Sequence, residues 1–392
     1  MSSILVINNG SSSLKFGLYQ ANRIVLRGIV DRIGNQPSMT LVHGDIETRS
    51  FQPRHSDHAS VAEALLEWLD NQDRLRTLQG IGYRIVHGGL TIREPVLLNE
   101  DTRAYLESLI PLAPLHQPQA LAVAGRLQER FPNLFHVACV DTAFHRTQPW
   151  VNQQFAIPRH LSDEGILRYG FHGLSYASIA KRLARHLGDT ADGRIVVAHL
   201  GQGCSLCALL HRQSQATSMG FTALDGLMMG RRCGSLDPGV ILYLLQQRGW
   251  SADAIERMLY HDSGLYGVSE LSDDMRDLEA SSNPQAQQAI ELFVNRIIQG
   301  IGALVAQLGG LDALVFTAGI GEHSSTIRSA ICQRLTWLGI ELDERANARN
   351  DTRLDNGQGP TVLMLPADEE REIAMATQQW VNQAGEHERD RT

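Results

Sequence analysis

The sequence has little cysteine and no long apolar run, and both shortages exclude classes of protein. Five cysteines among 392 residues are too few and too scattered for a disulfide framework, which favours a reducing compartment. The apolar run Ile4–Ile7 is too short for a secretory signal, and no basic segment precedes it. The sequence contains no run of about 18 or more apolar residues, so it predicts no membrane span. We therefore expect a cytoplasmic protein without a membrane partner.

An excess of positive charge is also missing. The 35 Lys and Arg against 43 Asp and Glu give a formal net charge of -8, which argues against a nucleic-acid partner. The 43% hydrophobic and 20% charged content is ordinary for a globular protein, and the length suits two domains.

The opening stretch ILVINNGSSSLKFGLY, residues 4–19, has a polar segment between two apolar runs. A hairpin turn needs only two residues such as Asn9-Gly10. The hydroxyls of Ser11 and Ser13 and the cation of Lys15 go beyond that need, and they suit a phosphate group. The alternative is a serine-rich hairpin with a solvated lysine.

Residues 194–210 repeat this layout of apolar run, glycine turn and apolar run, which indicates a duplicated α/β architecture. Period-2 and helical patterns predict the other main elements. Strands are expected in residues 1–50, 80–89, 134–145 and 313–319, and helices in residues 61–69, 119–130 and 285–308.

Glycine loops follow two of the expected strands, at HLGQG (199–203) and GIGEH (319–323). Backbone N–H groups in such loops can face a phosphate or a nucleotide, although a tight turn alone explains each loop. Residues 274–276 add a charged helix start with the same two interpretations. Cys204 and Cys207 fit C-x-x-C, but their apolar strand favours packing over redox chemistry.

Four polar residues occupy strand ends or loops: Arg84, Asp141, His172 and Arg232. Each alone is more often structural. Together, two arginines, a histidine and an aspartate suit phosphoryl transfer, which needs positive charge on the phosphoryl oxygens and a metal held by carboxylate.

Ordered segments along nearly the whole chain resemble the acetate kinase family: VINNGSSSLKF, YRIVHGG, PLAPLH, DTAFH, YGFHG, AHLGQG, SMGFTALDGLMMGRRCGSLDPG, SDDMRDLE, FTAGIGEHS and PADEE. The resemblance implies a duplicated actin/hexokinase-like (ribonuclease H-like) α/β fold. We expect one domain in residues 1–145 plus 372–392 and a nucleotide-binding domain in residues 146–371. It also implies a homodimer that transfers phosphate reversibly between ATP and a small carboxylate, acetate, with Mg²⁺ or Mn²⁺.

The resemblance also implies roles for individual residues. Asp141, His172 and Arg232 would be catalytic, Arg84 would bind the carboxylate, and Asn8 and Glu369 would hold the metal, with Glu370 as an alternative to Glu369. The acyl pocket would comprise Val86, Leu115, Phe171 and Ala223. The nucleotide would contact Ser11, Ser13, Lys15, His199, Leu200, Gly201, Gln202, Gly203, Asp274, Met275, Arg276, Gly319, Ile320, Gly321, Glu322 and His323.

The chain departs from the family pattern at four positions. Asn9 replaces a small residue, Gln202 stands in a loop that is usually GNG, and His323 stands where GEN usually ends. Ala223 replaces a common proline and leaves room for one or two more carbons, so propionate is an alternative substrate. A sugar or polyol kinase and a non-catalytic nucleotide-binding module are the more distant alternatives.

Overall fold

The computed structural model describes residues 2–10, 13–41, 47–50, 53, 56–114 and 116–389. It divides into two compact units. The N-terminal unit comprises Met1–Phe144 and Asp368–Thr392, and the C-terminal unit comprises His145–Ala367. The boundary between Ala367 and Asp368 places Glu369 and Glu370 in the N-terminal unit, whereas the expected boundary lay after residue 371.

The N-terminal unit contains an eight-stranded mixed sheet of order β5-β4-β3-β2-β1-β6-β8-β7. β1 pairs antiparallel with β2 and parallel with β6, and β6 pairs parallel with β8. The strands are β1 (Ser3–Asn9), β2 (Leu14–Gln20), β3 (Arg23–Asp31), β4 (Ser38–Leu41), β5 (Glu47–Ser50), β6 (Leu78–Ile85), β7 (Val96–Leu97) and β8 (Phe135–Val140).

The C-terminal unit repeats the central part of that topology in a five-stranded sheet of order β11-β10-β9-β12-β13. β9 pairs antiparallel with β10 and parallel with β12, and β12 pairs parallel with β13. The strands are β9 (Ile195–Leu200), β10 (Cys204–Leu210), β11 (Gln213–Thr217), β12 (Ala313–Thr317) and β13 (Thr361–Met364). Three antiparallel strands followed by two parallel ones in both units confirm the duplicated actin/hexokinase-like fold.

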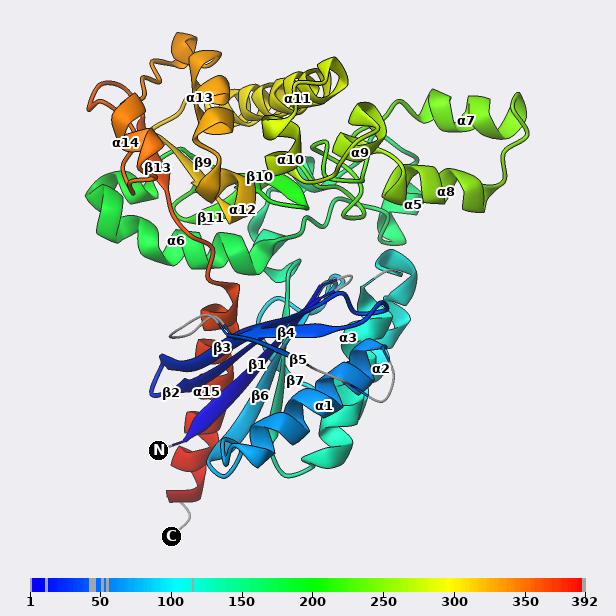
Figure 1. Ribbon diagram of the computed structural model, residues 1–392, viewed down its shortest axis with the longest axis vertical. Coiled ribbons are helices and arrows are strands. Elements are labelled where there is room, and N and C mark those ends of the chain that lie inside the picture. Colours follow the sequence, from blue (N-terminus) through cyan, green and yellow to red (C-terminus); the bar gives the residue numbers. More distant parts are fainter. Residues whose placement is uncertain are drawn as a thin grey trace. The chain divides into compact units, whose positions relative to one another are not determined.

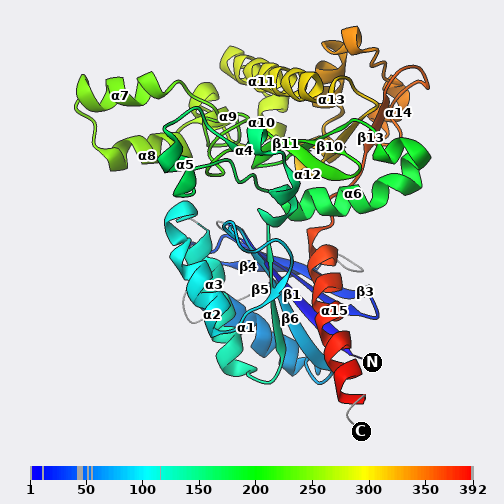
Figure 2. The same ribbon diagram turned by 180° about the vertical axis from the view of Figure 1, so that it is seen from behind.

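Helices cover both faces of the N-terminal sheet, as Figures 1 and 2 show. On one face Ile81, Tyr83 and Ile85 of β6 join a core with α1 (His58–Asn71) and α3 (Gln117–Arg130). On the other face Gly80 and Gly82 lie beneath α15 (Glu369–Arg389), because a Cβ at either glycine would meet Thr377. Side chains of β6 alternate between the two faces of the sheet, so its glycines share one face. The helix α15, from the far end of the chain, packs on that face.

In the C-terminal unit, α6 (Gly173–Leu187) and α11 (Pro284–Leu308) pack on opposite faces of the sheet. Ser205 of β10 contacts Tyr176 of α6, whereas Leu206 faces Gly300 of α11. By length and composition alone α11 could cross a membrane. A core helix has the same properties, and Phe293, Ile297 and Ile301 are fully buried in this unit.

Shorter elements complete the two units. They are α2 (Glu100–Ser108), α4 (Trp150–Gln153), α5 (Arg159–Asp163), α7 (Pro238–Gln246), α8 (Ala252–His261), α9 (Gly264–Ser269), α10 (Met275–Ala280), α12 (Ala318–His323), α13 (Ser325–Gln333), α14 (Glu344–Ala348) and the 3₁₀ turns η1 (Ile110–Leu112), η2 (Ala143–Thr147), η3 (Gly188–Asp192) and η4 (Thr336–Leu338). The expected loop at residues 319–323 is therefore a short helix. Cys204 and Cys207 are both buried free thiols in β10, as packing residues should be.

Candidate active site

In the N-terminal unit, an ion pair between a partly buried arginine and a buried aspartate joins two of the expected site residues. Arg84 projects from β6 and Asp141 directly follows β8, so parallel strands bring both to the carboxyl edge of the sheet. Arg84 Nη2 lies 2.7 Å from Asp141 Oδ2, and Arg84 Nε lies 3.2 Å from the same oxygen. Burial alone would lower the pKa of Arg84, but Asp141 and Glu369 outweigh it and raise that pKa. The guanidinium therefore stays charged.

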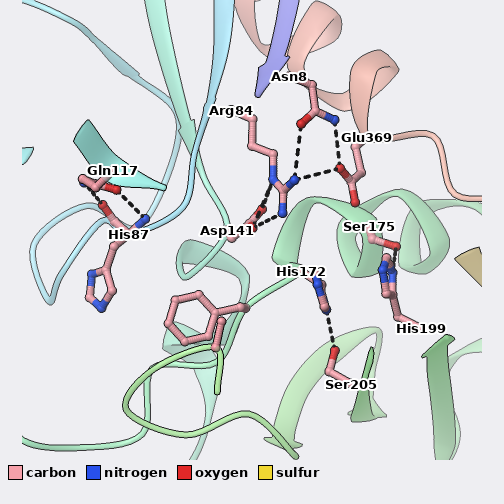
Figure 3. A network of polar contacts seen from close by, with 12 residues as sticks. Asn8, Arg84, His87, Gln117, Asp141, His172, Ser175, His199, Ser205 and Glu369 are labelled. Carbon is pink, nitrogen blue, oxygen red and sulfur yellow. Dashed lines mark hydrogen bonds and ion pairs between the residues drawn. The ribbon is translucent and has the colours of Figure 1, made fainter. Parts of the chain in front are cut away.

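Asn8, at the end of β1, connects this ion pair to the start of α15 (Figure 3). Its Oδ1 accepts a hydrogen bond from Arg84 Nη1 at 3.3 Å. Its Nδ2 donates to Glu369 Oε2 and to Glu370 Oε1, both at 3.1 Å. The structure thus brings together Asn8, Arg84, Asp141 and both candidate metal carboxylates, from four separate stretches of sequence.

Lys15 projects from the same sheet face as Asn8. The two residues are direct partners in the antiparallel register of β1 and β2, and side chains of such partners share a face. The Lys15 side chain is exposed, and Gly10 N donates to Ser13 O at 2.8 Å to close the turn. Ser11 lies outside the described residues, so its expected phosphate contact stays a prediction.

Arg27 is a member of this site that the sequence did not indicate. From β3 its Nη2 lies 3.0 Å from Asp368 Oδ1 and 3.4 Å from Glu370 Oε2, which ties the start of α15 to the sheet. Burial raises the pKa of neighbouring Tyr19 to about 12, and the charge of Asp368 acts in the same direction. The sequence does not reveal this contact, because Arg27 on β3 and Asp368 just before α15 are 341 positions apart.

Gln117 fixes the turn that follows β6. Its Oε1 accepts from His87 N at 3.1 Å, and its Nε2 donates to His87 O at 2.9 Å (Figure 3). The side chain is fully buried, so these bonds hold the adjacent Val86 in place. Val86, an expected pocket residue, is also buried. Leu115 lies outside the described residues.

In the C-terminal unit, His172 caps α6 in the left-handed region, with φ of 57°. Its Nδ1 lies 2.8 Å from Ser205 Oγ on β10. Its ring stacks on that of His199, with centroids 4.1 Å apart and an angle of 16° between the planes. His199 Nδ1 in turn lies 2.9 Å from Ser175 Oγ, so each of the two rings is held by its own serine (Figure 3).

Arg232 and the turn after β9 lie close to His172. A Cβ at Gly203 would lie 3.2 Å from His172 Nε2 and 3.3 Å from Arg232 Nη2, so only a glycine leaves this approach open. Arg232 Nη1 also donates to the carbonyl of Ala223 at 2.7 Å. The position where the chain departs from the family's proline therefore holds the arginine expected to act in catalysis.

His145 supports the backbone before His172. It is fully buried, its Nδ1 lies 2.9 Å from Ser214 Oγ, and its Nε2 lies 2.8 Å from the carbonyl oxygen of Phe171. Burial lowers the pKa of His145 to about 4, so the ring is neutral near pH 7. Phe171, expected in the acyl pocket, is buried as well.

The remaining expected nucleotide residues lie in three segments of the C-terminal unit. Leu200 ends β9, and Gly201, Gln202 and Gly203 form the turn to β10, which Gly201 N closes on Gly203 O at 3.2 Å. Asp274 caps α10 through Arg276 N at 2.9 Å and pairs with the Arg276 guanidinium, while Met275 is buried. Asp274 thus has the helix-start role that was the alternative to ligand binding, and Arg276 is largely exposed.

α12 carries Gly319, Ile320, Gly321, Glu322 and His323 and starts at Ala318, whose φ is 65°. Glu322 Oε1 accepts from Ala318 N at 2.8 Å and from Ala367 N at 2.9 Å, so its carboxylate has a structural role. The buried Arg328 donates to the carbonyls of Gly321 and Glu322. His323 is exposed at the end of this helix.

The donor set of the N-terminal unit fits a hard cation. Among the described residues, the four carboxylates of Asp141, Asp368, Glu369 and Glu370 lie near two guanidiniums, those of Arg84 and Arg27. Among the described residues no three His, Cys, Asp or Glu side chains form a metal-binding group by themselves. Mg²⁺ commonly takes one or two carboxylates and completes its shell with water and substrate phosphates, which agrees with this arrangement.

The duplicated fold and the similarity to acetokinases make this chain an ATP-dependent carboxylate kinase. A family model described as the acetokinase family matches residues 3–375. The chain belongs to the acetokinase family.

Known proteins resemble the chain over most of its length. It is 49% identical over 355 residues to an acetate kinase of Rhodopseudomonas palustris, covering 88% of this chain and 89% of that one. A propionate kinase from Francisella tularensis has a TM-score of 0.91 at 35% identity and covers 97% of this chain and 100% of its own. An acetate kinase of Porphyromonas gingivalis has a TM-score of 0.88 at 32% identity and covers 97% and 99%.

Proposed function

We propose that this chain is an acetate kinase, which transfers a phosphoryl group reversibly from ATP to acetate and gives acetyl phosphate and ADP. The observation that carries the proposal is the meeting of Arg84 with Asp141, Asn8 and Glu369 in a chain of the acetokinase family. A guanidinium fixed by a carboxylate is a rigid, permanently charged donor for the carboxylate of a substrate.

The acceptor needs no general base, because a carboxylic acid with a pKa of about 4 is already ionised near pH 7. The protein therefore supplies alignment and charge. We assign Arg84 to the acetate carboxylate, Val86, Leu115 and Phe171 to its methyl group, and His172 and Arg232 to the oxygens of the transferring phosphoryl group. Asp141 holds Arg84 in its charged and oriented state.

Asn8 and Glu369, with Glu370 as an alternative, would hold Mg²⁺ or Mn²⁺. When bound, the ion supplies positive charge that neutralises the phosphates of ATP. Asn8 keeps both carboxylates in reach through its amide nitrogen. Lys15, on the same sheet face, is the natural cation for the phosphate tail.

Propionate is the second candidate substrate. Ala223 lacks the ring of the family's common proline, and the extra space could take one more methylene, worth about 0.8 kcal/mol if buried. The similarity to the Francisella tularensis propionate kinase supports this alternative. Acetate remains the main proposal, since relatives named acetate kinase share up to 49% of their residues with this chain.

A homodimer is the proposed assembly, and α7 supports it. No residue of α7 is buried, although its sequence PGVILYLLQ is mostly apolar. Leu242 and Tyr243 are each 52% exposed, and Figure 1 shows α7 and α8 at the margin of their own unit. A contiguous apolar helix face of this kind marks an interface, and a second copy is the occupant the family suggests. A dimer in the cytoplasm, without nucleic-acid or membrane partners, completes the proposal.

The test is trapping of acyl phosphate as hydroxamate, with ATP and Mg²⁺ and with acetate, propionate or butyrate in parallel reactions. We expect product with acetate, a lower yield with propionate and little with butyrate. ADP release with glucose or glycerol is the matched control for a sugar or polyol kinase. Absence of hydroxamate with every acid would contradict the proposal, and release with a sugar would replace it.

A further inference from the structure

A chain of three polar side chains leads away from His172 into the core of the C-terminal unit. Ser205 Oγ lies 2.8 Å from His172 Nδ1 and 2.5 Å from the hydroxyl oxygen of Tyr176. Ser205 and Tyr176 are fully buried; Ser205 lies on β10 and Tyr176 lies on α6, which packs against that strand. Nothing in the assigned chemistry requires a buried tyrosine at this place.

The proton positions in this chain follow from the chemistry of its members. Ser205 has a single proton to donate, and it lies between two polar atoms. A phenol is a better donor and a poorer acceptor than an aliphatic alcohol, because its oxygen lone pair is delocalised into the ring. Burial raises the pKa of Tyr176 well above its usual value, so the phenol keeps its proton. An arrangement in which Tyr176 donates to Ser205 and Ser205 donates to His172 Nδ1 uses the serine's single proton and agrees with both distances.

We propose that Ser205 and Tyr176 are positioning residues that hold His172 in the tautomer with its proton on Nε2. The inference rests on the proposed function, in which His172 acts on the transferring phosphoryl group. An acceptor role for Nδ1 leaves the ring proton on Nε2, the atom that lies beside Gly203 and Arg232. His172 and Arg232 then present two N–H donors to one place, as a phosphoryl oxygen requires.

The opposite tautomer would place a lone pair at Nε2, where it would repel a phosphoryl oxygen. The stacked His199 ring restricts rotation of the His172 ring, which helps to keep Nδ1 directed at Ser205. The two hydroxyls thus select one of the two tautomers of the His172 imidazole, as the hydrogen-bond partner of a functional histidine does in other proteins.

Nitrogen-15 spectra of histidine-labelled protein test the tautomer directly, and the His172 signals are assigned as those missing from a His172→Gln variant. In the unaltered protein we expect Nε2 to carry the proton. Ser205→Ala should turn His172 into a mixture of tautomers and lower kcat about tenfold to hundredfold, with the KM for ATP nearly unchanged. Tyr176→Phe should change the tautomer ratio of His172 in the same direction to a smaller extent. Ser205→Thr keeps the hydroxyl and should retain the proton on Nε2.

Ser175→Ala is the matched control, because it removes the same hydroxyl from the stacked His199 and should leave the His172 signals in place. A proton on Nδ1 in the unaltered protein would overturn the proposal, as would an unchanged tautomer in Ser205→Ala. The spectra report the tautomer whether or not the protein has catalytic activity. An intact tautomer preference in a protein without acyl kinase activity would therefore reject the proposed function alone.

Discussion

Arg84 and Asp141 form a largely buried pair in which one guanidinium is held through two of its nitrogens. Nη2 and Nε lie 2.7 Å and 3.2 Å from the same carboxylate oxygen, and Asp141 is fully buried. Such a pair is costly to break, because removing one side chain leaves the opposite charge in a largely buried place without its nearest ion-pair partner.

Arg84→Ala should therefore affect both stability and binding. We expect the free energy of unfolding to fall by about 3–5 kcal/mol, since Asp141 loses its guanidinium inside the protein. The KM for acetate should rise more than the KM for ATP. Denaturant unfolding and steady-state kinetics measure the two effects. Arg76→Ala is the control, because Arg76 belongs to an exposed pair with Asp73 and should change neither. Unaltered stability together with an unaltered acetate KM would refute the assignment.

Gly203→Ala should lower turnover without unfolding the protein. A Cβ at this position meets His172 Nε2 at 3.2 Å and Arg232 Nη2 at 3.3 Å, so both tips must shift by a few tenths of an ångström. We expect kcat to fall at least tenfold, given the sensitivity of phosphoryl transfer to positioning. Gly302→Ala in α11 is the control, because a Cβ there meets no atom within 4 Å. Equal kcat in the two variants would show that His172 and Arg232 do not act at this turn.

Substitution at position 223 should change the preference between acids. Ala223→Pro fills the space that the family's proline occupies, so the ratio of propionate to acetate kcat/KM should fall about fourfold, the equivalent of ~0.8 kcal/mol for one methylene. Ala223→Gly should change the ratio in the opposite direction. The carbonyl that accepts from Arg232 is retained in both variants. A ratio that does not respond to either substitution would remove position 223 from the acyl pocket.

Leu242→Glu should weaken the proposed dimer. A charge on the exposed apolar face of α7 cannot be buried against a second copy without a large desolvation cost. Sedimentation should show a shift toward monomer at concentrations where the unaltered protein is a dimer. Trp337→Glu is the control, because Trp337 is 69% exposed but lies on η4 rather than α7. A dimer that survives Leu242→Glu would place the interface elsewhere.

His145 should make stability depend on pH. Burial lowers its folded-state pKa to about 4, below the ordinary value of 6.5, so the unfolded chain binds the proton more readily. Stability is therefore fully present above pH 6.5, declines as pH falls toward 4, and loses about 3 kcal/mol over that window. His145→Gln keeps a donor for the Phe171 carbonyl but does not titrate, so its unfolding free energy should fall less. Parallel pH profiles of the two proteins would disprove this assignment.

The sequence predicted the duplicated sheets because each begins with the same pattern of strand, glycine turn and strand, at residues 4–19 and 194–210. Pairing of those strands is local, so their order follows from short connections. The pattern did not predict that residues 319–323 form a helix, since Ala318 adopts a left-handed conformation that alanine rarely takes. Tertiary contacts to Glu322 compensate for that conformation.

The supporting residues of the site were the part that sequence reasoning missed. Arg27, Gln117 and Ser205 act through partners between 30 and 341 positions away, and nothing local distinguishes them from surface or core residues. His172 and Arg84 were noticeable because they interrupt apolar or glycine-rich stretches. Polar residues that act through a neighbour give no such signal, and only the fold reveals them.

The return of α15 to the first sheet has a consequence for synthesis. Gly80 and Gly82 leave room on the sheet for Thr377 of this helix, and Glu369 and Glu370 are its first residues. The ribosome must complete the entire C-terminal unit before either carboxylate exists. A nascent chain therefore carries Arg84 and Asp141 for most of its translation without the acidic partners of Asn8, and it gains the carboxylates proposed to hold the metal only in the last stage of assembly.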